Sequence, residues 1–144
     1  MNLSVAQTWG LSAPIDYLVQ RKGFDPEQVK GMEREYRRYL AIVAAHPGEK
    51  LPISSKVDDL WHAHILHTKD YVDFTQALAG RLIGHVPTKS EDERQALECC
   101  YINGTLKRYL EMFEEEAPEN FWPRTAGSIC LDCHPDIESV TQVH

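Results

Sequence analysis

The sequence predicts an all-α fold: a small helical bundle with three long helices, one short helix and an irregular C-terminal tail. Capping residues mark the starts of the long helices, and apolar residues follow them at spacings of three and four. No stretch alternates apolar and polar residues as a half-buried strand does. With 144 residues, 42% of them hydrophobic and 26% charged, the chain is long enough to bury a core of its own.

Two helices are predicted in the first third of the chain. The short helix begins at Pro14 and ends at Gly23. The first long helix has Asp25 as its cap and Pro26 in its first turn, and it runs to about Ala45. Its apolar stripe consists of Val29, Met32, Tyr36, Leu40 and Val43.

The second long helix is predicted from Ser55 to Ala79. Asp58 follows Ser55 at the spacing of a capping box, with aspartate in place of the usual glutamate or glutamine. Neither proline nor glycine occurs before Gly80, so nothing in this stretch predicts an interruption.

The third long helix opens with a full capping box, Ser90 with Glu93, and Pro118 ends it. Gly104, inside this helix, indicates a kink or a close contact with another helix. Residues 1–123 are therefore predicted to form a helical domain. Residues 124–144 are predicted to be an irregular tail.

Three of the seven histidines lie in the second long helix, at positions 62, 64 and 67. On an α-helix, Asp58 and His62 lie within roughly 40° of each other, whereas His62 and His64 differ by roughly 160°. One helix therefore cannot direct both His62 and His64 at a common ion. Asp58 and His62 share one face, and Trp61, His64, Thr68 and Tyr71 share another.

Asp58 and His62, joined by His85 from the following loop, are the candidate metal ligands. Two imidazoles and one carboxylate suit a divalent transition metal with open positions, zinc in first place and iron in second. Alternatively, Asp58 orients His62 without binding the ion, or it is a helix-capping residue beside a core histidine. No glutamate stands at the HExxH spacing, so a zinc protease is not indicated.

His64 is the candidate general acid or base if the site is catalytic, because an imidazole exchanges protons near neutral pH. It is equally a candidate for a buried, hydrogen-bonded histidine. The clustered imidazoles also leave open a pH-responsive or metal-sensing protein.

The segment Cys130-Leu131-Asp132-Cys133-His134 is the informative part of the tail. A structural zinc clip through Cys130 and Cys133 is one interpretation, with two further ligands from His134, His144, Cys99 or Cys100. Free thiols are the alternative. The segment also matches the c-type haem attachment pattern, which the absence of an export signal disfavours.

The net charge of −7 argues against binding to nucleic acid through phosphates and against a basic membrane-binding surface. The N-terminus lacks a basic region followed by an apolar run, and no stretch approaches the ~20 apolar residues of a membrane span. We therefore expect a cytoplasmic protein with reduced cysteines, whose partner is an unidentified protein or small molecule.

The motif around the histidines resembles that of a bacterial family related to plant glycine-rich domain-containing proteins. The matching residues are Val57, Asp58, Asp59, Trp61, His62, His64, Ile65, Leu66, Thr68 and Tyr71. Residues 80–87 resemble the second histidine motif of that family, although Gly84 stands where relatives carry a first histidine. The resemblance implies a small helical domain in which Asp58, His62, His64 and His85 are the positions to test. It implies no particular reaction.

Two functions remain in competition. The first is a metal-binding domain that uses Asp58, His62 and His85 and that could be catalytic. The second is a non-catalytic interaction module, such as an adaptor, an inhibitor or an immunity-type protein, with a buried histidine network or a structural metal. Small size, an acidic surface and the lack of a complete catalytic signature favour the second function.

Overall fold

The computed structural model describes residues 1–87, 90–124, 129–130 and 133–135. Its helices are α1 (Ser4–Thr8), α2 (Ser12–Asp16), the π-helix η1 (Tyr17–Arg21), α3 (Pro26–Ala45), α4 (Ser55–Leu66), α5 (Thr68–Ala79), α6 (Glu91–Cys100), the π-helix η2 (Tyr101–Leu106) and α7 (Lys107–Phe113). Its strands are β1 (Ile53–Ser54), β2 (His85–Pro87), β3 (Ile129–Cys130) and β4 (Cys133–Pro135). The predicted all-α class is confirmed.

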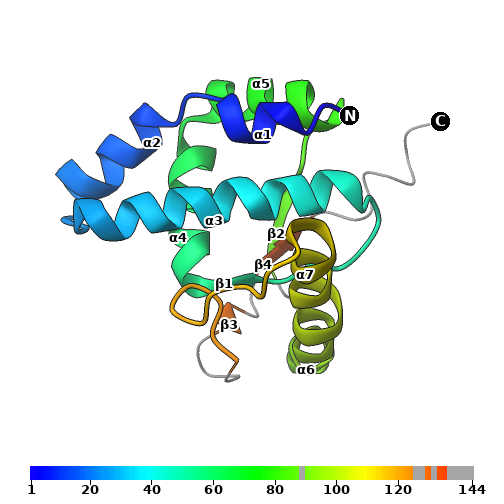
Figure 1. The fold of residues 1–144 in the computed structure, drawn as a ribbon. Coiled ribbons are helices and arrows are strands. Elements are labelled where there is room, and N and C mark those ends of the chain that lie inside the picture. The colour runs from blue at the N-terminus through cyan, green and yellow to red at the C-terminus, as the bar shows by residue number, and fades with distance from the viewer. Residues whose placement is uncertain (88–89, 125–128, 131–132, 136–144) are drawn as a thin grey trace.

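Helix α3 is the central element of the fold (Figure 1). Its start is as predicted: the carboxylate of Asp25 accepts a hydrogen bond from the backbone N–H of Gln28 at 3.2 Å, and Pro26 occupies the first turn. The predicted apolar stripe is buried along its whole length. In Figure 1, α1 and α5 lie on one side of α3 and α7 lies on the other, so α3 contacts most of the elements that build the core.

The predicted single helix over residues 55–79 is interrupted at His67, which leaves the helical region with φ −92° and ψ 66°. In a continuous helix the N–H of residue 67 would donate to the carbonyl oxygen of residue 63. Instead, that N–H donates to His64 O at 3.0 Å, and Nδ1 of His67 lies 2.8 Å from Ala63 O. The imidazole thus replaces a backbone hydrogen bond, and the chain turns without proline or glycine. The cap of α4 is Ser54, one residue before the expected position.

The third predicted helix is continuous but includes the π-helical turn η2 between α6 and α7. A Cβ on Gly104 would lie 3.4 Å from both Leu51 and Lys50, so the close contact is with the connector before β1 and not with another helix. The hydroxyl of Thr105 donates to Pro52 O at 2.7 Å and holds the same connector against η2. The helix ends at Phe113, earlier than Pro118, because Glu114 adopts a left-handed conformation with φ 55°.

A buried carboxylate fastens the end of the helical region to α3. Tyr109 Oη and Trp122 Nε1 both donate to Oε1 of Glu35, at 2.7 and 2.9 Å. Arg34 Nε lies 3.5 Å from the other carboxylate oxygen. Burial and the hydrogen bond to Glu35 raise the pKa of Tyr109 to about 12. The buried Trp122 therefore anchors the end of the helical region to α3, with Glu35 as its acceptor.

Replacing Glu35 with glutamine should lower the free energy of unfolding by about 1–2 kcal/mol, because two buried donors lose an ionised acceptor. Urea denaturation followed by tryptophan fluorescence measures this loss. Glu33→Gln, at a half-buried position on the same helix, is the matched control and should cost less. Equal losses in the two variants would show that the hydrogen bonds from Tyr109 and Trp122 to Glu35 do not stabilise the fold.

Part of the C-terminal tail forms short antiparallel pairings with the helical domain. β3 pairs with β1, with Cys130 opposite Ile53, and β4 pairs with β2, with Pro135 opposite His85 and Cys133 opposite Pro87. The described tail segments therefore lie beside the start of α4 and beside the strand that carries His85. Within the described ranges, no helix combines the length and the apolar character that crossing a membrane requires.

Candidate metal centre

The three predicted ligands Asp58, His62 and His85 come together in the structure. Asp58 and His62 lie in the first two turns of α4, and His85 begins β2. Nε2 of His85 lies 3.0 Å from Oδ1 of Asp58, and Nε2 of His62 lies 3.2 Å from Oδ2. The two imidazole rings are 4.6 Å apart between centroids. One carboxylate thus meets two imidazoles from separate elements.

Burial differs sharply among these three side chains. The side chain of Asp58 is 3% exposed, that of His85 is 14% exposed and that of His62 is 53% exposed. The carboxylate is therefore enclosed by the protein, whereas His62 borders the solvent. Any additional ligand of a bound ion would approach from the side of His62.

The ring of His85 is positioned by a chain of buried contacts. Its centroid lies 4.2 Å from that of Trp61, whose Nε1 donates to Tyr71 Oη at 2.9 Å. Tyr71 Oη in turn donates to Ile83 O at 2.5 Å, two residues before His85. Burial raises the pKa of Tyr71 well above its ordinary value, so the phenol keeps its proton. Trp61 and Tyr71 thus hold the loop that delivers His85.

Replacing Tyr71 with phenylalanine should destabilise the fold by about 1–3 kcal/mol, because Trp61 Nε1 and Ile83 O lose their buried partner. Zinc affinity should also fall by about 10-fold or more, as it does when a group that orients a ligand is removed. Thermal denaturation and a zinc titration measure the two effects. Unchanged zinc affinity in a stably folded variant would show that Tyr71 does not position His85 for metal binding.

The donor atoms fit a metal ion. One ligand atom from each of the three residues lies within 4.8 Å of the others. Ligands held at about 2.0–2.2 Å in a tetrahedral zinc site lie about 3.4 Å apart, so small rotations of the imidazoles suffice. The same contacts also form a complete hydrogen-bonded cluster if each Nε2 carries a proton and donates to Asp58. Metal binding would displace those protons.

A cavity of about 310 Å³ adjoins His62. It is lined by Tyr17, Leu18, Lys22, Phe24, Asp59, His62, Ala63 and Leu66. Burial, reinforced by the charge of Asp58, raises the pKa of Asp59. Sequence reasoning did not single out Asp59, although it directly follows Asp58. The carboxylate of Asp59 gives this cavity an acidic group beside the candidate ligand His62.

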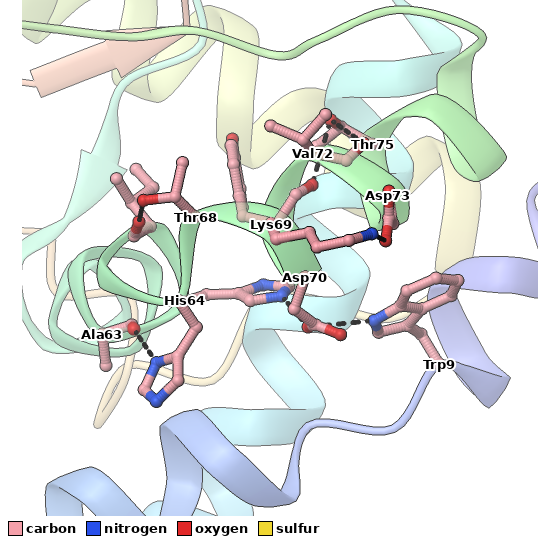
Figure 2. A network of polar contacts seen from close by, with 12 residues as sticks. Trp9, Ala63, His64, Thr68, Lys69, Asp70, Val72, Asp73 and Thr75 are labelled. Carbon is pink, nitrogen blue, oxygen red and sulfur yellow. Dashed lines mark hydrogen bonds and ion pairs between the residues drawn. The ribbon is translucent and has the colours of Figure 1, made fainter.

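His64 lies in a different environment from the three candidate ligands. Its ring is completely buried, with Nδ1 2.7 Å from Tyr36 Oη and Nε2 2.8 Å from Oδ2 of Asp70. Trp9 Nε1 donates to the same oxygen of Asp70 at 3.2 Å. Figure 2 shows the imidazole and the indole converging on Asp70. Burial lowers the pKa of His64, and the hydrogen bond to Asp70 opposes this shift.

The prediction that His64 lies apart from Asp58 and His62 is confirmed, but the rest of its predicted face is divided: Trp61 packs on His85, Thr68 is exposed, and Tyr71 contacts both Trp61 and His64. The acid or base role of His64 stays a prediction, and Asp70, whose side chain is 42% exposed, connects its cluster to the solvent. Sequence reasoning did not include Asp70, because six residues from His64 is off the helical period. The two residues meet only because the chain turns at His67. The sequence places Tyr36 in the apolar stripe of α3, and no sequence signal pairs it with His64.

The predicted zinc clip at Cys130 and Cys133 lies outside the described side chains. The backbone of both residues is in β3 and β4, beside β1 and β2. Of the other two cysteines, Cys99 is exposed and Cys100 is half-buried, and both are free thiols. The zinc clip stays a prediction.

Comparisons with known proteins identify one family. The family described as UCP032817-like matches residues 11–117, which include the three candidate ligands and the buried His64 cluster apart from Trp9. No curated protein and no solved structure matches the chain. This match does not test the resemblance to plant glycine-rich domain-containing proteins, which stays a prediction. Because the match covers well over half of the sequence, the chain belongs to the UCP032817-like family.

Proposed function

We propose that this protein binds one divalent transition metal ion through Asp58, His62 and His85. The observation that carries the proposal is the buried carboxylate of Asp58, which lies within 3.2 Å of Nε2 atoms from two separate elements. A carboxylate is seldom enclosed without a partner, and two of the partners of Asp58 are imidazoles, the commonest metal ligands.

Zinc is the first candidate and iron(II) is the second. Catalytic zinc sites use three protein ligands and keep a fourth position open, and two histidines with one carboxylate also form the facial triad of non-haem iron proteins. A bound ion of either kind supplies Lewis-acid chemistry to an oxygen atom. The cavity beside His62 is the place for the molecule that carries this oxygen.

The openness of the site favours an ion that remains accessible over a purely structural one. Structural zinc sites are closed by four protein ligands. In the part of the chain that the structure describes, three candidate ligands meet, and His62 is half exposed. A bound ion would therefore keep a position open, on the side of His62, for an exchangeable ligand.

Zinc binding can be measured by isothermal titration of chelator-treated protein in a Cys130→Ser, Cys133→Ser background, which removes the predicted clip. We expect one ion per chain, and loss of binding in both His62→Ala and His85→Ala. His46→Ala is the matched control, because His46 caps the end of α3 with Nδ1 2.9 Å from Ile42 O. Failure of the parent protein to bind zinc or iron(II) would refute the proposal.

The non-catalytic interaction module is supported by a different feature of the same residues. Both imidazoles can satisfy Asp58 through hydrogen bonds alone, so the cluster can stabilise the fold without an ion. Under this alternative His62→Ala lowers the free energy of unfolding equally with and without zinc. Under the metal proposal, zinc stabilises only the parent protein, since a ligand stabilises the state that binds it.

A further inference from the structure

A second cavity lies between α1, α3 and α7, and it shares no lining residue with the metal centre or its adjoining cavity. Its volume is about 530 Å³, within the range of small-molecule sites. Three arginines of α3 line it, at positions 34, 37 and 38, together with the apolar side chains Leu3, Ala6, Ala41, Met112 and Phe113. The cavity therefore combines cationic and apolar walls.

The arginines differ in how firmly the chain holds them. Arg37 is fixed, because its guanidinium donates to Glu33 at 2.7 and 3.0 Å and to Ala6 O at 3.1 Å. Arg38 and Arg34 share one oxygen of Glu115, at 2.7 and 3.4 Å. Arg38 also donates to Tyr109 Oη at 2.9 Å, and Arg34 Nε lies 3.5 Å from Glu35. A carboxylate bridging two guanidinium groups is thus already present beside this cavity.

The bridge to Glu115 can be exchanged for an external anion. The side chain of Glu115 is 48% exposed and that of Arg34 is 56% exposed, and ion pairs in such surroundings are weak. Glu115 follows Glu114, whose left-handed conformation is unfavourable for a residue other than glycine. Releasing Glu115 breaks its 2.7 Å ion pair with Arg38, whose side chain is 22% exposed, so the external anion has to replace that contact.

The apolar wall determines what kind of anion fits. Phe113 lies under the guanidinium of Arg38, with 4.6 Å between Cζ and the ring centroid, so a cation and an aromatic face adjoin within one site. Met112 and the small Ala41 continue this wall. A ligand with a charged head and an apolar body would satisfy both parts, whereas an inorganic anion would leave the apolar wall in contact with water.

We propose that this cavity binds a small amphiphilic carboxylate, whose head group bridges Arg34 and Arg38 in place of Glu115 and whose apolar body lies on Met112 and Phe113. The fork geometry of arginine suits carboxylate recognition, and the contact with Glu115 demonstrates this chemistry in the chain itself.

Isothermal titration of the full chain with sodium octanoate tests the proposal, with 1-octanol as the neutral probe, acetate as the probe without an apolar body and octyl phosphate as the alternative head group. We expect octanoate to bind with a Kd of about 10 μM to 1 mM, and acetate and octanol to bind at least about 10-fold more weakly. Arg34→Gln should weaken octanoate binding by about 5-fold or more, whereas Glu115→Gln should strengthen it by removing the competing carboxylate.

Lys30→Gln is the matched control, because Lys30 is an exposed cation of the same helix that pairs only with exposed Glu27 in the described contacts. It should leave octanoate affinity unchanged. Three results would overturn the proposal: no binding of octanoate, equal affinities in the parent, Arg34→Gln and Glu115→Gln proteins, or binding of octyl phosphate alone. Zinc affinity is expected to be the same with and without octanoate, so failure here leaves the metal proposal standing.

Discussion

Replacing Asp58 with asparagine should lower the affinity for zinc by more than about 100-fold while the helical fold persists. Altering a group that only orients a ligand costs 10–100-fold, and Asp58 is proposed to bind the ion directly. Asparagine keeps the shape of the side chain but removes the negative charge. A competition titration against a chromophoric zinc chelator in the Cys130→Ser, Cys133→Ser background measures the change, and circular dichroism checks the fold.

Asp73→Asn is the control for this experiment, since Asp73 is an exposed carboxylate that pairs with Lys69 at 2.8 Å (Figure 2). Its zinc affinity should equal that of the parent. Because an imidazole binds an ion only in its neutral form and a carboxylate only in its ionised form, the affinity of the parent should also fall as the pH is lowered. Equal affinities in Asp58→Asn and Asp73→Asn would remove Asp58 from the ligand set.

Replacing His64 with alanine should lower the free energy of unfolding by about 3–5 kcal/mol. The substitution leaves a cavity beside Phe74, whose ring lies 5.2 Å from that of His64, and it strips Tyr36 Oη of its partner. Urea denaturation gives the value. His46→Ala is the matched control, because His46 is half-buried and its Nδ1 contacts a single backbone carbonyl, Ile42 O. A cost for His64→Ala no greater than that of His46→Ala would contradict the buried network.

His64 should also make the stability of the protein dependent on pH. Burial lowers the pKa of His64 in the folded state, so the unfolded chain takes up this proton more readily. The contribution of neutral His64 is therefore complete above the ordinary imidazole pKa and is lost as the pH falls below it. The difference in unfolding free energy between the parent and His64→Gln should shrink on acidification, by at most about 1.4 kcal/mol per pH unit. A difference that grows on acidification would contradict the sign of this shift.

Local rules were sufficient for α3 and for two of the three residues of the metal centre. The cap at Asp25 and the apolar periodicity locate α3, and the four-residue spacing places Asp58 beside His62. His85 was included because a loop histidine could complete the set. What holds His85 in place, the chain from Trp61 through Tyr71 to Ile83, is a tertiary feature that no local spacing reveals.

The remaining features depend on contacts between distant segments or on a competition that local rules do not resolve. At the turn, the imidazole of His67 occupies the carbonyl oxygen of Ala63 in place of a backbone N–H. Neither proline nor glycine marks this turn in the sequence. Without that turn, the meeting of His64 with Asp70 could not be foreseen. The arginine-lined cavity likewise needs α1, α3 and α7 in their folded positions, since on α3 alone the arginines look like a solvated face.

The most direct test of the central claim is anomalous diffraction at the zinc edge from crystals of the zinc-loaded protein. We predict an anomalous peak within about 2.0–2.2 Å of a carboxylate oxygen of Asp58 and of Nε2 of both His62 and His85. The claim would be contradicted by the absence of a peak at these three residues, including the case in which the only ordered zinc lies at Cys130 and Cys133.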